Sequence, residues 1–388
     1  MDDGFRGTDL DDLMRHLDTT GRVEFGRVLA RQAEAGRPVA CAVVNPFMPW
    51  AVDVAADAGV PSAVLWVQSC TVFSLYHHHV HGLVEFPPED DVEARVELPG
   101  LPPLAVADVP SFLLPSNPFK LLADAIITQF RTIDKGVLGV RQLLHRAGTR
   151  RGGGAGRRDD DAAPARSSSP WARSSTWGPT SSRRQTTGGV RGDLIKAADE
   201  CVEWLNAQAA VLRGAGRSLG GAGPTRGPLL PAGFLDAVAE GRGMVVPWSP
   251  QERVLAHAST ACFLTHCGWN STLETLAAGV PVVAFPQWGD QCTDAKFLVD
   301  QLRVGVRLRA KPLGRDAVSG RPWRRSWAGQ EAEEMRANAR RWSAAARAAV
   351  APGGSSDKHV QAFVDEVRRR ACGEETAPAD EAKVSTTD

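Results

Sequence analysis

Short apolar runs alternate with amphipathic stretches in two separate parts of the chain. In the first part, residues 37–45 and 60–67 are runs of small and β-branched side chains, and stretches with a helical spacing of apolar positions follow at 48–59 and 69–82. This order of strand, helix, strand and helix predicts a parallel sheet, because parallel neighbours need a crossover connection. A further amphipathic helix is predicted over residues 118–133.

The second alternating part covers residues 242–309. Its apolar runs are bounded by polar turns, and helical stretches follow them in a regular order. The elements predicted here are strands at 243–247, 261–265, 280–286 and 305–309, and helices at 249–258, 271–279 and 294–302. Ligands bind open parallel sheets beyond the carboxyl ends of the strands, so the turns that follow these strands are the first candidates for a site.

The composition changes outside these two parts. Residues 149–190 are rich in Arg, Gly and Ser, and they carry too few large apolar side chains to offset the entropy of ordering them. Two more helical stretches follow at 331–350 and 355–371. We therefore expect five segments: a partial N-terminal domain (1–134), a disordered linker (135–190), a C-terminal domain (191–350), a C-terminal helix (351–371) and a disordered tail (372–388).

The charge balance and the cysteine spacing limit the classes of partner that the chain is expected to bind. The 388 residues include 45 Lys and Arg and 45 Asp and Glu, so no net field draws the chain to nucleic acid or to an anionic membrane. A membrane span would need a run of about 18 apolar residues, and the sequence has none. The 7 Cys are scattered without zinc spacing. We expect a monomeric cytoplasmic protein whose partners are small molecules.

The turn at residues 265–271 has the features of an anion site. Gly268 lets the backbone approach a ligand, and a helix that starts at Asn270 or Ser271 presents free N–H groups and the positive end of its dipole. His266, at the end of the preceding strand, can donate to a phosphate oxygen. The alternative is that Ser271 and Glu274 have the spacing of a capping box, which alone would explain both residues.

Tryptophans follow two other strands of the same predicted sheet. An indole at Trp248 or Trp288 can stack on a nucleobase, an interaction worth about 1–3 kcal/mol. Gln251, one helical turn after Trp248, can bond the base edge or a ribose. The alternative for each tryptophan is ordinary core packing.

Further polar side chains in or near these turns complete the set of candidate site residues. Glu274 offers a carboxylate to a diol such as ribose. Asp290 and Gln291 close the third turn as an acceptor and an amide, which is suited to sugar hydroxyls. One edge of the sheet therefore carries candidate residues that could bind a base, a ribose, a diphosphate and a sugar.

Residues 248–291 resemble, from first to last, the 44-residue nucleotide-sugar signature of plant family 1 UDP-dependent glycosyltransferases. The resemblance implies an α/β fold of GT-B type, with two Rossmann-like domains whose parallel sheets face a cleft, here with an incomplete N-terminal domain. It also implies contacts with uracil (Trp248, Ser249), ribose (Gln251, Glu274), diphosphate (His266, Asn270, Ser271) and sugar (Trp269, Asp290, Gln291). In this family, a Gln at the last position usually accompanies glucose.

Residues 36–70 and 98–119 are similar to family members that glucosylate carboxylic acids such as indole-3-acetate and hydroxycinnamates. This second resemblance implies an enzyme, a glucosyltransferase that inverts the sugar configuration. Its co-substrate is UDP-glucose, and it requires no other cofactor and no metal. The implied acceptor is a small aromatic or indolic carboxylic acid or a phenol.

The catalytic base of the family has no counterpart that we can assign. In the family it is a His near the N-terminus, oriented by an Asp after a later strand. The sequence begins about where that His is expected to have passed, and the only early His, His16, lies in an acidic helical stretch. Asn45 occupies the position of the orienting Asp. The family pattern also breaks at residues 135–188 and 319–330, as a degraded gene or a faulty gene model would produce.

Other functions remain as alternatives. One is a catalytically impaired fragment that binds UDP without turnover. An NAD-dependent oxidoreductase is disfavoured because no G-x-G-x-x-G follows a strand, and an ATPase because the Gly-rich run at 152–157 lacks the Lys and Ser/Thr of a P-loop. A histidine cluster allows either a metal site or a plain helix face, and no carboxylate or Cys lies near it (His77, His78, His79, His81).

Overall fold

The computed structural model describes residues 10–86, 88–91, 93–132, 198–207, 243–246, 248–308 and 329–372. The predicted disordered linker and tail, apart from Cys372, lie outside the described residues, as do residues 319–328 of the second break in the family pattern. No helix within the described ranges is long and apolar enough to cross a membrane.

The N-terminal part contains the predicted parallel pair of strands. β1 (Ala42–Val44) and β2 (Ser62–Val64) pair in parallel, with Val43 opposite Ala63. The predicted crossover helix is α3 (Trp50–Asp57), which ends before Gly59 with φ of 68°, and α4 (Cys70–Val80) follows β2. The Ser69 side chain accepts the N–H of Val72 and caps α4.

Helices and short hairpin strands surround this pair. α1 (Leu10–His16), the π-helical turn η1 (Leu17–Gly21) and α2 (Arg22–Glu34) form one continuous helical stretch. The antiparallel strands β3 (Arg95–Val96) and β4 (Leu104–Ala105) lead into the 3-10 turns η2 (Val106–Asp108) and η3 (Ser111–Leu113), and then α5 (Lys120–Thr132). A core cluster joins α4 to α5, through Phe73 and Tyr76 on one side and Ile126 and Phe130 on the other.

The C-terminal part contains a three-stranded parallel sheet in the order β5-β6-β7. Its strands are β5 (Phe263–Thr265), β6 (Val282–Ala284) and β7 (Gly305–Arg307). Its helices are α7 (Glu200–Asn206), α9 (Gln251–Leu255), α10 (Trp269–Ala278) and α11 (Gln291–Lys296), the last continued by the π-helical turn η6 (Phe297–Gln301). All three residues of the central strand β6 are buried, as expected for a strand covered on both faces.

The predicted strand at 243–247 is wrong. Residues 243–246 have no strand assignment, and the side chains of Met244 and Val245 are exposed. Val246 packs instead against a small cluster around Cys201, Leu205 and Val254. A run of Val favours extended backbone, but a strand also requires a hydrogen-bonded neighbour, which the described residues do not supply here.

The two predicted C-terminal helices are confirmed as α13 (Gln330–Val350) and α14 (Ser355–Ala371). α13 packs on α10, where Ser343 Oγ donates to the carbonyl of Ala277 at 2.7 Å. The joint between the helices contains Gly353, with φ of 78°, and Gly354, where a Cβ would lie 2.3 Å from the carbonyl oxygen of Ala348. The backbone conformation at residue 353 and the lack of space at residue 354 therefore both favour glycine.

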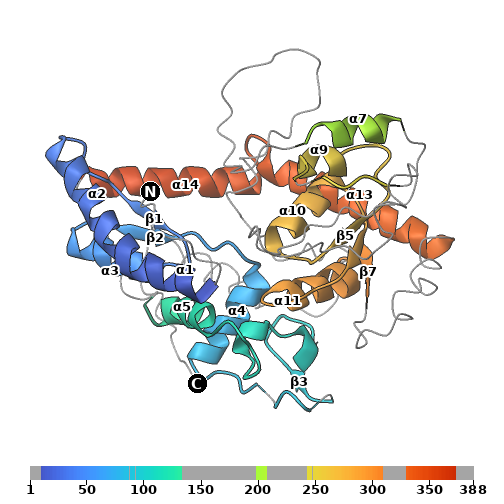
Figure 1. The fold of residues 1–388 in the computed structure, drawn as a ribbon, viewed down its shortest axis with the longest axis horizontal. Coiled ribbons are helices and arrows are strands. Elements are labelled where there is room, and N and C mark those ends of the chain that lie inside the picture. Colours follow the sequence, from blue (N-terminus) through green and yellow to red (C-terminus); the bar gives the residue numbers. More distant parts are fainter. Residues whose placement is uncertain are drawn as a thin grey trace, which may run out of the picture.

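α14 lies beside the N-terminal part rather than the sheet that precedes it. Figure 1 shows it as a long helix that runs back toward β1 and α2. Phe363 and Val367 of α14 line a cavity of about 370 Å³ together with Cys41 and Val43. α14 thus lies beside β1, with this cavity between them.

Candidate functional site

The turns predicted to carry the chemistry lie at one edge of the C-terminal sheet. β5 and β6 are parallel, with Thr265 opposite Ala284, so the turns 266–268 and 285–290 leave the sheet at the same end. α4 and α11 lie where the N-terminal and C-terminal parts meet (Figure 1). The cavity between β1 and α14 has different lining residues and is not part of this site.

The helix that follows β5 begins earlier than predicted. α10 starts at Trp269, and its N-cap is Gly268, which makes no side-chain cap. Ser271 is therefore the third residue of the helix instead of its cap, and the capping-box alternative for Ser271 and Glu274 is wrong. The first turn of the helix places backbone N–H groups at the strand edge, where the helix dipole is positive.

A strained turn brings the imidazole of His266 against the start of this helix. Cys267 is fully buried with φ of 65°, and its N–H donates to Thr265 Oγ1 at 3.1 Å. A Cβ at Gly268 would lie only 2.5 Å from Nε2 of His266, so the ring occupies the space that any larger residue would fill. Backbone strain of this kind is a feature of functional turns, and here it places the imidazole beside the helix N-terminus.

The residues predicted to hold ribose and diphosphate contact one another. Nε2 of Gln251 donates to the Glu274 carboxylate and, at 3.4 Å, to Ser271 Oγ. Gln251 is the first residue of α9, whereas the other two lie one turn apart on α10. Two helices thus bring an amide, a carboxylate and a hydroxyl together, while Asn270 beside them is exposed.

The two tryptophans have different environments. Trp248 and Ser249 are partly exposed just before α9, and the carbonyl of Trp248 accepts the N–H of Ala198 at 2.8 Å. Trp288 packs against the N-terminal core, with its ring centroid 5.6 Å from that of Phe112 and 5.0 Å from that of Phe119. Trp288 is partly exposed, as Trp248 is, but its ring contacts favour the core-packing alternative for this residue.

Gln291 stabilises the loop that precedes it. Its side chain is buried, and Oε1 accepts the N–H groups of Gln287 at 2.8 Å and Trp288 at 3.1 Å. The carbonyl end of the amide is therefore engaged within the loop, and any bond to a sugar would come from the Nε2 end.

Asp290 and Asp294 form a hydrogen-bonded pair of carboxyl groups where the two parts of the chain meet. Asp290 also accepts from the Trp269 N–H and contacts Gln68, while Asp294 contacts Ser69. Burial raises the pKa of Asp290 to about 6. Burial, and then the charge of Asp290, raise the pKa of Asp294 well above its usual range. At neutral pH the proton therefore resides on Asp294, which donates it to the ionised Asp290.

We expect Asp294→Asn to stabilise the protein at high pH. Because the folded-state pKa of Asp294 is raised, the folded state binds a proton that the unfolded state has lost, so its stability falls as the pH rises above about 4. Asn is neutral and keeps a donor toward Asp290. The free energy of unfolding of the variant relative to the parent should rise from pH 5 to pH 8, by up to about 1.4 kcal/mol per pH unit. The difference between the two melting temperatures should widen accordingly.

The matched control for this prediction is Asp300→Asn, because Asp300 is an exposed carboxylate that pairs with Lys296 at 2.8 Å. It should show no such widening. A difference between the Asp294→Asn variant and the parent that is the same at pH 5 and pH 8, measured by thermal denaturation, would contradict the pKa assignment.

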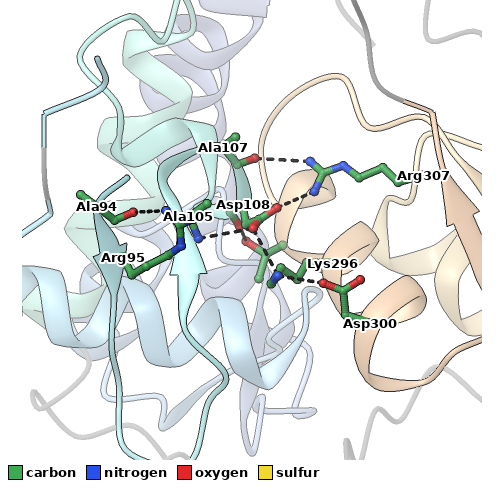
Figure 2. Close-up of polar contacts among 9 residues, drawn as sticks. Ala94, Arg95, Ala105, Ala107, Asp108, Lys296, Asp300 and Arg307 are labelled. Atoms are coloured by element: carbon green, nitrogen blue, oxygen red, sulfur yellow. Dashed lines mark hydrogen bonds and ion pairs between the residues drawn. The ribbon is translucent and has the colours of Figure 1, made fainter. Parts of the chain in front are cut away.

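An ion cluster that the sequence does not predict joins the two parts. Figure 2 shows the Asp108 carboxylate between Lys296 and Arg307. Arg307 also donates to the carbonyl of Ala107 at 3.3 Å, and Thr293 Oγ1 donates to the carbonyl of Asp108 at 2.7 Å. Asp108 and Arg307 are 199 residues apart, so periodicity and local spacing carry no signal for this contact.

The remaining predicted residues lie away from the strand edge. Oδ1 of Asn45 accepts the N–H of Phe47 at 2.9 Å and so stabilises its own turn. His16 ends α1. Nδ1 of His78 and Nδ1 of His81 lie 2.7 and 2.8 Å from helix carbonyls of α4. These contacts favour the plain helix face, and no group of three His, Cys, Asp or Glu within the described ranges is arranged to hold a metal.

Comparisons with known proteins agree on one family. Residues 231–317 match the family model described as UDP-glucoronosyl and UDP-glucosyl transferase. A gallate 1-beta-glucosyltransferase of Punica granatum is 40% identical over 94% of this chain and 76% of its own length. A cinnamate beta-D-glucosyltransferase of Fragaria ananassa is 39% identical over 93% and 69%, respectively. The crystal structure of Os79 from O. sativa in complex with UDP superposes with a TM-score of 0.68 at 26% identity, covering 92% of this chain and 84% of that one.

Proposed function

Because the chain belongs to the family of UDP-glucuronosyl and UDP-glucosyl transferases, we propose that it transfers glucose from UDP-glucose, with inversion, to a small aromatic or indolic carboxylic acid or a phenol. The fold is the α/β GT-B type, as its structural neighbours have. The enzyme class, UDP-dependent glycosyltransferase, and the use of a UDP-sugar as co-substrate follow from the family. The assignment of site residues and the acceptor are the proposal.

The observation that carries the proposal is the convergence of polar groups at the ends of β5 and β6. The contact of Gln251 with Glu274 and Ser271 supports a ribose and phosphate subsite. Trp248, one turn before Gln251, is the proposed uracil platform, with Ser249 bonding the base through its backbone. Trp269, Asp290 and the amide nitrogen of Gln291 are the proposed sugar contacts.

In the proposed reaction, charge develops at two places. The acceptor carboxylate forms a bond to the anomeric carbon as the bond from that carbon to the β-phosphate oxygen breaks, and UDP leaves with the electron pair. The sugar passes through a state with oxocarbenium character. The imidazole of His266 and the N–H groups of Asn270 and Ser271 stabilise the charge that builds on the diphosphate.

An acid acceptor suits this site because a carboxylic acid is already ionised at pH 7 and needs no base. Asn45, at the position of the family's orienting Asp, has its Oδ1 engaged in its own turn. The similar proteins of Punica granatum and Fragaria ananassa are named for gallate and cinnamate. Both observations support a carboxylate as the nucleophile.

We expect the protein to form a glucose ester when it is incubated with UDP-glucose and cinnamic, gallic or indole-3-acetic acid. An ester is cleaved by mild alkali, whereas a phenolic glucoside is stable, so chromatography before and after alkali distinguishes the two products. The methyl esters of the same acids are the matched control, because they lack the ionised oxygen and should give no ester.

Other outcomes separate the alternatives. A phenolic glucoside formed from the methyl ester would identify a phenol as the acceptor. Binding of UDP without turnover on any acid would favour the impaired fragment, which the comparisons do not support. The predicted cytoplasmic location and monomeric state stay predictions.

A further inference from the structure

The loop proposed to contact the sugar is held by the N-terminal part of the chain. Ser111 and Gly289 exchange two hydrogen bonds: the Ser111 N–H donates to the Gly289 carbonyl at 3.0 Å, and the Gly289 N–H donates to Ser111 Oγ at 2.7 Å. Both backbone groups of Gly289 are thus engaged by one residue, and Asp290 follows directly. Ser111 of the N-terminal part is therefore bonded to the loop at the residue before the Asp290 carboxylate.

Glycine at position 289 permits this approach. Its φ is 67°, a value that side chains disfavour, and a Cβ there would lie 3.4 Å from the ring of Phe112. The neighbouring Trp288 packs between Phe112 and Phe119. The loop is therefore fixed by ring packing at residue 288 and by hydrogen bonds at residue 289.

The helix that follows the loop, α11, is also held by the N-terminal part. Thr293 is fully buried and donates to the Asp108 carbonyl at 2.7 Å, and Asp108 holds Lys296 and Arg307 in the cluster of Figure 2. By contrast, the contact that joins Gln251, Ser271 and Glu274 lies wholly within the C-terminal part. The nucleotide half and the sugar half of the proposed site thus have different supports.

We propose that Ser111 is a positioning residue for the donor sugar: it sets the place of Asp290 and Gln291 from across the interface, so that the glucose subsite forms only when the two parts are docked. The inference rests on the proposed function, in which Asp290 and Gln291 contact the sugar. Ser111 itself acts through the loop.

The test compares the affinity for UDP-glucose with the affinity for UDP, measured by calorimetric titration of the full chain. In Ser111→Ala, the ratio of the Kd for UDP-glucose to the Kd for UDP should rise roughly fivefold over that of the parent, as expected for the loss of about one hydrogen bond. The Kd for UDP should stay within about twofold. Ser111→Thr keeps the hydroxyl and should restore most of the ratio.

Ser116→Ala is the matched control, since Ser116 is an exposed serine in the same segment and bonds Glu89 through its backbone N–H. It should leave the ratio unchanged. If Ser111→Ala weakens UDP and UDP-glucose equally, or changes neither, the positioning role is overturned. A parent protein that does not bind UDP would instead overturn the proposed function, so the two failures are distinct.

Discussion

Replacing His266 by alanine is expected to lower kcat for glucosyl transfer by about 10²–10³-fold, the loss typical of removing one donor that stabilises developing charge. The imidazole lies against Gly268 at the start of α10, where the proposed leaving group gains its charge. The melting temperature should change little, because His266 is not fully buried. Steady-state kinetics with UDP-glucose and the best acid acceptor provide the measurement.

Two further variants sharpen this result. Gly268→Ala leaves the imidazole in the sequence but places a methyl group where the ring lies, so it should reduce kcat in the same direction by moving the ring. His81→Ala removes an exposed histidine of the N-terminal part and is the matched control. Equal activity of His266→Ala and His81→Ala would remove His266 from the mechanism.

Replacing Trp248 by alanine should weaken UDP binding by roughly 5- to 150-fold, the range that corresponds to about 1–3 kcal/mol of stacking on one base. The indole is partly exposed beside Gln251, where a uracil would lie against it. Calorimetric titration with UDP measures the loss directly, and Trp248→Phe should retain most of the affinity because it keeps an aromatic face.

The same variant tests whether Trp248 only packs against its neighbours. Packing predicts a lower melting temperature with unchanged UDP affinity in the protein that remains folded. Stacking predicts the opposite, a loss of affinity with a small change in melting temperature. An unaltered Kd for UDP in Trp248→Ala would therefore show that the base binds elsewhere.

Most helices and the parallel strand pairs could be predicted because their signals are local. The apolar spacing over 355–371 predicts α14 at its observed bounds. The run at 243–247 misleads because composition carries no information about a hydrogen-bonded neighbour. The sequence predicts too late a start for α10 because Ser271 is a residue type that caps helices, whereas the observed N-cap, Gly268, makes no side-chain bond.

The residues of the proposed nucleotide subsite could be predicted from the sequence, but the contacts that hold the proposed site in place could not. Gln251, Ser271 and Glu274 follow from motif spacing, and the structure brings them into contact. Trp288 follows a strand as Trp248 does, but it packs against the N-terminal core. The sequence does not predict this difference, because its partners, Phe112 and Phe119, are distant along the chain. The bonds of Asp108 and Ser111 to the C-terminal part arise only from tertiary contact.

α14 connects the C-terminal part of the chain with the N-terminal part. Because α14 is joined to the C-terminal part through α13 and also lines a cavity with Cys41 and Val43 of the N-terminal part, a change in the angle between the two parts would also move this helix. The joint between α13 and α14 contains Gly353, whose φ of 78° other residues disfavour, and Gly354, where neighbouring carbonyls leave no space for a Cβ. Two glycines thus set the direction in which α14 runs back to the N-terminal part.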